Sequence, residues 1–178
     1  MNAFIQRLAF GLTVCLLSSC TTDPSSDPNR FSLPPGELAH LRAPQRVTLT
    51  NAYTVAAVKQ MQIGLIRLDF DQKQFTDTAI AVLTRAMDKH GIAVAPQAEK
   101  TITLRVRGPT DLRMRGGLGA TSRTATLYLD AEFGDGTSTS LEAEETTGGE
   151  FTRAMDGAVV VALKDLVADE KFVAYMKR

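Results

Sequence analysis

The sequence is poor in the residues that most site chemistries need. Its 178 residues include two cysteines, two histidines and no tryptophan. Cys15 and Cys20 are both close to the amino terminus, so the rest of the chain has no thiol for a disulfide, a thiolate metal site or a cysteine nucleophile. His40 and His90 stand alone, which argues against a histidine-rich metal site. Stability must therefore come from an apolar core.

The charges are balanced, and the motifs of cofactor sites are missing. Lysine plus arginine number 20, as do aspartate plus glutamate, so nothing favours nucleic acid as a partner. The glycine-rich stretch 108–123 lacks the Lys-Ser or Lys-Thr pair of a phosphate loop, and the acidic stretch 69–80 has Gln74 and Ile80 where a calcium loop needs Gly and an acid. We expect no catalytic residue, no metal and no cofactor. A Ser-His-Asp triad stays open, because its members meet only in the fold.

Long hydrophobic runs are also missing. The apolar stretch Leu8–Leu17 is too short for a membrane-spanning helix, which needs roughly 20 residues. It follows Arg7 and ends in small residues, which is the layout of an export signal. The closing Leu17-Ser18-Ser19-Cys20 resembles the lipobox of bacterial lipoproteins. That resemblance implies a signal peptide over residues 1–19, cleavage before Cys20, and a lipid on the Cys20 sulfur.

The fate of Cys20 decides where the protein resides. The alternative to lipidation is an ordinary cleaved signal with an incidental cysteine. With lipidation, Thr21 in place of an aspartate resembles sorting to the outer membrane, so we expect a protein at the periplasmic face of a Gram-negative outer membrane. Loss of Arg7 with the signal would leave one acidic side chain in excess.

A proline-rich tether is predicted over residues 20–45. It holds five of the seven prolines, mixed with Ser, Asp and Thr. Proline removes backbone donors and disfavours helix, so we expect an extended or disordered chain. Four apolar side chains interrupt this composition and predict that part of the tether docks on the domain: Phe31, Leu33, Leu38 and Leu41.

Residues 46–178 predict a single α+β domain. Apolar stripes at helical spacing predict one helix from Thr76 or Asp77 to Lys89, a second over 151–166, and a short final helix from Asp169. Strand patterns cover 46–54, 62–70, 92–94, 102–107 and 125–133, with a return strand through Leu141 and Ala143. Clean alternation predicts an antiparallel sheet with one covered face. We expect the two main helices on that face and polar strand positions on the other.

The charges are unevenly placed along the strands. Residues 105–123 hold five arginines and one aspartate, whereas residues 130–150 hold seven acids and no base. One interpretation is that neighbouring strands pair these charges on the solvated face. The other places Arg113 and Arg115 at the tip of a glycine-rich loop, where they bind a carboxylate surface or anionic lipid. Leu112, Met114 and Leu118 would then add apolar contacts.

Several segments together resemble the YajG-like family of small envelope lipoproteins. These are the lipobox, the helix "TAIAVLTRAMDKHGIAV", the strand "TITLRVR", the segment "TATLYLDAEFGDGTSTSLEAEETTGGEF" and the closing "AMDGAVVVALKDLVADEKFVAYM". The resemblance covers about residues 45–176 and extends to accessory lipoproteins of lipopolysaccharide assembly and lipid transport. It implies an anchored, non-enzymatic domain with no site residue beyond Cys20.

The sequence therefore predicts a lipoprotein that works by binding. We expect an accessory or adaptor facing the periplasm, held to the membrane by acyl chains on Cys20 and bound to an envelope protein. The alternative is a lipid- or glycan-binding lipoprotein of an envelope transport system, which would use the space between helices and sheet or the arginine-bearing loop. An envelope hydrolase would instead need a cleft joining His90 to carboxylates.

Overall fold

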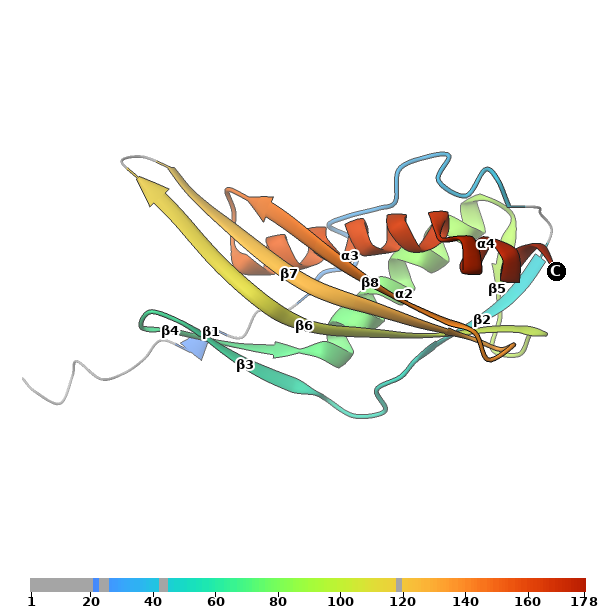
Figure 1. The fold of residues 1–178 in the computed structure, drawn as a ribbon, viewed down its shortest axis with the longest axis horizontal. Coiled ribbons are helices and arrows are strands. Elements are labelled where there is room, and N and C mark those ends of the chain that lie inside the picture. Colours follow the sequence, from blue (N-terminus) through green and yellow to red (C-terminus); the bar gives the residue numbers. More distant parts are fainter. Residues whose placement is uncertain (1–20, 23–25, 42–44, 118–119) are drawn as a thin grey trace, which may run out of the picture.

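The computed structural model describes residues 21–22, 26–41, 45–117 and 120–178 (Figure 1). The signal peptide expected over 1–19 and the proposed lipid site Cys20 lie outside the described residues, as does Leu118. Within them the chain forms two sheets and three helices. The α+β fold class predicted from the sequence is confirmed.

The main sheet has five strands in the spatial order β5-β2-β6-β7-β8. Their bounds are β5 (Ile92–Val94), β2 (Gln45–Asn51), β6 (Lys100–Gly117), β7 (Ala120–Phe133) and β8 (Ser138–Thr147). The sheet is mixed, because β2 runs parallel to both β5 and β6, while β6, β7 and β8 are antiparallel. The prediction of an antiparallel sheet was thus correct for these three strands only. A parallel neighbour requires a long crossover connection, and here helix α2 supplies it.

A small sheet lies beside the main one. The strands β3 (Val58–Ile63) and β4 (Ile66–Asp71) form a hairpin, and β1 (Thr21–Thr22) pairs in parallel with β4. The prediction of one strand over 62–70 was therefore wrong. Gly64 has φ +59°, a left-handed conformation that glycine adopts without steric cost, and it turns the chain inside this stretch.

Three helices complete the fold in the described residues: α2 (Gln72–Lys89), α3 (Phe151–Ala168) and α4 (Glu170–Lys177). Helix α2 begins before the predicted start at Thr76 or Asp77, because the Asp71 carboxylate caps it by accepting from the Lys73 amide at 2.9 Å. Asp169 caps α4 in the same way, and α4 begins directly after it, close to the predicted start. Gly91, at φ +80°, follows the end of α2.

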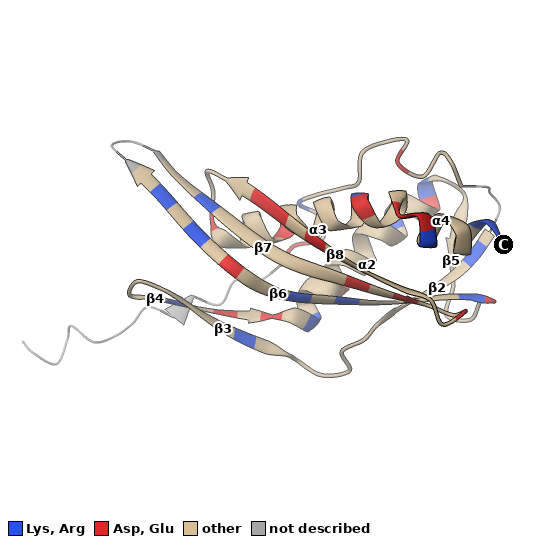
Figure 2. Cartoon of the chain, viewed as in Figure 1, with Lys and Arg blue, Asp and Glu red and all other residues tan. Residues whose placement is uncertain are grey.

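The core lies between the helices and one face of the main sheet, as expected (Figure 1). The α3 stripe is buried as its spacing predicted, and it belongs to the same core as buried strand residues such as Leu104 and Leu129. Full burial of one such leucine stabilises the fold by roughly 1.5–3 kcal/mol. Charged residues lie along β6, β7 and β8 (Figure 2). Arg105, Arg107 and Glu132 alternate with buried residues, so their side chains lie on the opposite, polar face of the sheet.

The described part of the tether, residues 26–41, packs against the helices. Leu33, Leu38 and Leu41 join the core, which confirms the docking that these side chains predicted. The Arg85 guanidinium of α2 donates to the carbonyl oxygens of Pro28 and Phe31, and Nε2 of His90 lies 3.1 Å from the Leu41 oxygen. The segment is thereby attached to α2 along its length.

The hairpin of β6 and β7 extends far beyond the predicted strands. The register shifts between Arg107 and Asp111, and pairing then continues from Asp111↔Thr126 to Gly117↔Ala120. We call residues 111–117 and 120–126 the distal arm. The sequence predicted a loop here, because its glycines and charges hide the alternation that places Leu112 against the core.

Candidate functional site

The distal arm carries the two arginines predicted to bind a partner. Arg113 lies in β6 with its guanidinium exposed, and it forms ion pairs with Asp111 at 2.8 Å and with Glu144 of β8. Arg115, two residues further along the same strand, is exposed and forms no ion pair among the described side chains. The structure thus brings the two arginines onto one strand, but it engages only Arg113 within the fold.

The arm presents an apolar side chain beside these charges. Met114 is 47% exposed, whereas Leu112 is buried against the domain. Figure 1 shows the arm extending past the first turn of α3, and residues 113–116 are exposed there. Because successive side chains of a strand point to opposite faces, the arm offers the Arg115 guanidinium on one face and the Met114 thioether on the other. These groups suit a partner that places carboxylates against the first face and apolar groups against the second.

Charges closer to the centre of the sheet are paired with one another. Arg107 of β6 donates to Asp130 of β7, at 2.9 Å for its Nη2, and it lies over the Tyr128 ring at 5.0 Å. The hydrogen bond from Arg107 lowers the pKa of Asp130 below its ordinary value of 3.8. Ser140 of β8 also donates to Asp130, at 2.7 Å. The prediction that neighbouring strands pair their charges is confirmed for Arg107 with Asp130, whereas the ion pair of Arg113 with Glu144 joins β6 to β8 across the intervening β7.

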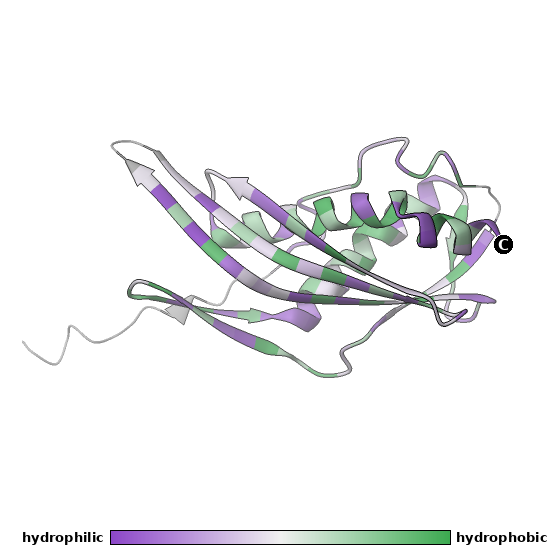
Figure 3. Cartoon of the chain, viewed as in Figure 1, coloured by the Kyte–Doolittle hydropathy of each residue, from purple (hydrophilic) through white to green (hydrophobic). Residues whose placement is uncertain are grey.

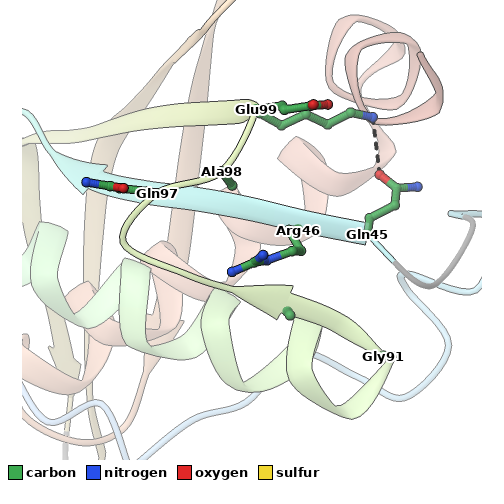
Figure 4. Close-up of a pocket in the computed structure, with 8 residues that line it drawn as sticks. Gln45, Arg46, Gly91, Gln97, Ala98 and Glu99 are labelled. Atoms are coloured by element: carbon green, nitrogen blue, oxygen red, sulfur yellow. Dashed lines mark hydrogen bonds between the residues drawn. The ribbon is translucent and has the colours of Figure 1, made fainter.

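A pocket of about 860 Å³ opens at the other end of the main sheet, where β5, β2 and β6 meet (Figure 4). Its lining residues are Gln45, Arg46, Gly91, Ala93, Gln97, Ala98, Glu99 and Lys100. The Lys100 amine donates to the Gln45 amide oxygen at 3.2 Å and to the Met176 carbonyl, and partial burial lowers its pKa. Arg46 is exposed and has no ion pair among the described residues, so it is the cation that the pocket offers to an anionic ligand.

The sequence did not single out this pocket, because no motif marks it. Its cations come from β2 and β6, which are separated in the chain by α2 and meet only through the parallel pairing of Val47 with Lys100. Strand direction cannot be derived from alternation, so the meeting of Arg46 and Lys100 could not be predicted.

A buried carboxylate, Asp156, joins the tether to the helices. Its side chain in α3 is 1% exposed, and burial raises its pKa above the ordinary 3.8. Ser26 donates to it and also lies 2.7 Å from the Thr78 hydroxyl of α2, while the Arg30 guanidinium approaches to 3.5 Å. An acid inside the apolar stripe of a helix is a signal that the sequence contains, and it would have indicated a buried polar contact.

Within the described residues no group of His, Cys, Asp and Glu could hold a metal ion. His90, at the C-cap of α2, lies against the tether through Leu41, and His40 is exposed in the tether itself. None of the helices in the described part of the chain is long and apolar enough to cross a membrane.

Comparison with known proteins gives structural likenesses alone, and these are weak. No protein-family model matches the sequence, and no curated protein matches it. A solved structure from Xanthomonas campestris, described by the family model DUF330, is 16% identical over 88% of this chain and 94% of that chain, with a TM-score of 0.45. A minor lipoprotein from Acinetobacter baumannii is 11% identical over 70% and 93%, with a TM-score of 0.37.

A third solved structure is a PelC dodecamer from Paraburkholderia phytofirmans. It is 14% identical over 79% of this chain and 90% of that chain, with a TM-score of 0.35. At these TM-scores the likenesses carry no weight for the function. The resemblance to the YajG-like family stays a prediction from the sequence.

Proposed function

We propose that this chain is a lipid-anchored envelope lipoprotein that acts without catalysis, as an accessory or adaptor facing the periplasm. The stretch Leu17-Ser18-Ser19-Cys20 supports the anchor, and Thr21 supports an outer-membrane location. The observation that carries the binding role is the distal arm, which holds the exposed Arg115 and Met114 on a paired strand rather than on a loop. A paired strand presents these groups with little loss of conformational entropy on binding.

The two arginines of the arm are not equivalent targets for substitution. Arg113 is engaged by Asp111 and Glu144, so its replacement disturbs the sheet face as well as the surface. Arg115 has no such ion pair among the described side chains, so Arg115→Glu changes the surface alone. Exposed ion pairs contribute only about 0–1 kcal/mol, and neither change should unfold the domain.

In-cell crosslinking of the anchored protein, followed by affinity capture and mass spectrometry, tests the adaptor role. We expect one abundant envelope protein with the wild type and a several-fold loss with Arg115→Glu and with Arg113→Glu/Arg115→Glu. The matched control is Arg153→Glu/Lys177→Glu, which makes the same charge change on α3 and α4. Equal capture by all variants would remove the arm from the interface, and absence of any reproducible partner would contradict the adaptor role itself.

A second candidate function rests on the end pocket. Arg46 and Lys100 are its cations, and its volume of about 860 Å³ is in the range of small-molecule sites. A lipoprotein that binds an anionic lipid or glycan in an envelope transport system would use this pocket. Native mass spectrometry of the purified protein should then detect a bound molecule that is lost in Arg46→Glu and retained in Arg153→Glu.

A further inference from the structure

The exposed apolar side chains gather around the small hairpin. Among the described residues, the large apolar side chains that are exposed are Val55, Val58, Leu65, Ile66 and Met114. Four of them lie within residues 55–66, and Leu65 at the turn of the β3–β4 hairpin is 91% exposed. Ile63 and Ile66 pair directly beneath that turn, so it has an apolar end (Figure 3). Val58 pairs with Asp71 at the base of the hairpin, so only Leu65 and Ile66 of this set lie at its turn. Single exposed leucines are ordinary on a surface, but two adjacent apolar side chains at a projecting turn indicate a contact site.

The chain that leads to Cys20 reaches the same end. Thr21 pairs with Arg67 and Thr22 with Leu68, so β1 lies beside the first residues of β4, directly after Ile66. Cys20 lies outside the described residues, but it is bonded to Thr21, and consecutive Cα atoms are only about 3.8 Å apart. A lipid on Cys20 would therefore be attached one residue before Thr21, which pairs beside the apolar end of the hairpin.

We propose that Leu65 and Ile66 insert into the bilayer that holds the Cys20 lipid, so that the β3–β4 hairpin is a second, non-covalent membrane contact. This inference rests on the lipid anchor of the proposed function. The acyl chains fix the hairpin end at the membrane surface. Apolar side chains held there can transfer from water into the acyl region of the bilayer, which is favourable. Arg67 is adjacent and partly exposed, and its long side chain can keep the guanidinium among the headgroups while Ile66 is buried.

Two contacts at one end would fix the orientation of the domain. The hairpin turn and the distal arm extend toward the same end of the long axis, and the end pocket lies at the other (Figure 1). The arm would then meet partners close to the membrane surface, and the pocket would open toward the periplasm.

Fluorescence of the full-length, lipidated protein in vesicles tests the insertion. The sulfur of Cys20 carries the lipid and Cys15 leaves with the signal, so Leu65→Cys would provide the only reactive thiol for a nitrobenzoxadiazole label. Leu65 is almost fully exposed, so the change leaves the core intact. The control is Ser138→Cys, an exposed, nearly isosteric site where the β7–β8 turn meets β8 at the other end of the molecule.

The vesicles contain phosphatidylethanolamine and phosphatidylglycerol, with or without a lipid that bears a doxyl quencher on its acyl chain. We expect the label at position 65 to shift to the blue, brighten several-fold and be quenched by the doxyl lipid, and the label at 138 to stay unchanged. Mass spectrometry of the amino-terminal peptide reports lipidation independently.

Each other result overturns the inference. A lipidated protein whose label at 65 emits as in water has its anchor but no inserted hairpin. A blue-shifted label that the doxyl lipid does not quench is covered by a second copy of the chain instead of by the bilayer. An amino terminus without lipid would contradict the proposed function itself, and the inference that rests on it.

Discussion

Asp156 is the carboxylate whose ionisation the fold penalises. Burial raises its pKa above the ordinary 3.8, although Ser26, Asp27 and Arg30 all donate to it or attract its charge. The folded chain therefore binds this proton more tightly than the unfolded chain. Between 3.8 and the raised value, the contribution of Asp156 to stability must fall as the pH rises.

This pH dependence can be tested with Asp156→Asn, which keeps the shape of the side chain and an acceptor oxygen but cannot ionise. The stability of the wild type relative to the variant should increase as the pH is lowered toward 4, because the wild type is relieved of a buried charge. Urea unfolding of both proteins from pH 7 to pH 4 measures the difference. The pKa of Asp130 is lowered, so its protonation in acid reduces the stability of the fold. This effect is the same in the wild type and the variant, so it cancels in the difference between them. A difference that does not change with pH would contradict the prediction.

At the scale of elements, the β3–β4 hairpin depends on one glycine. Gly64 holds φ +59°, and a left-handed conformation costs an L residue roughly 1–2 kcal/mol. A Cβ at Gly64 would meet no atom within 4 Å, so this backbone cost acts alone.

We therefore expect Gly64→Ala to lower the free energy of unfolding by about 1 kcal/mol. Gly148→Ala is the matched control, since Gly148 also has no atom within 4 Å of an added Cβ and does not have a positive φ. Thermal or urea unfolding of the three proteins measures the effect, and equal losses in both variants would show that the turn conformation is not the cause.

Among the elements, the helices could be predicted from the sequence, whereas the strand directions and the distal arm could not. The helices at 76–89 and 151–166 follow from apolar stripes, because helical periodicity reports which face is buried. The parallel placement of β2 was missed, since alternation carries no strand direction. The distal arm was missed because glycines and arginines there mimic a loop. For the candidate site, Arg113 and Arg115 were named, but the partners of Arg113 and the meeting of Arg46 with Lys100 depend on pairing that only the fold establishes.

At the scale of the whole molecule, the tether is part of the domain from Ser26 to Leu41. Arg85 contributes three of its polar contacts, with bonds to the carbonyl oxygens of Pro28 and Phe31 and to Asn29 at 3.2 Å. Removing such a group leaves carbonyl acceptors without their charged donor, which costs roughly 1–3 kcal/mol where they are buried.

Arg85→Ala should therefore loosen the docked tether without unfolding the sheet. We expect hydrogen exchange over residues 26–41 to rise at least several-fold, while exchange in β6 and β7 stays the same. Arg153→Ala, which removes an exposed arginine with no ion pair in the described part of the chain, should leave the tether protected. An equal rise in the strands would indicate global destabilisation and would contradict local release.

The Ser26 contact with Asp156 spans 130 residues, and this separation imposes an order on folding. Helix α3 emerges near the end of synthesis, so the amino-terminal segment has no docking surface until nearly the whole domain is present. Closing so long a loop is also slow compared with forming a helix or hairpin. We therefore expect residues 26–30 to be open to enzymes early in the life of the chain and to become protected once folding ends. The position of one aspartate thus makes docking of the amino-terminal segment a late event in folding.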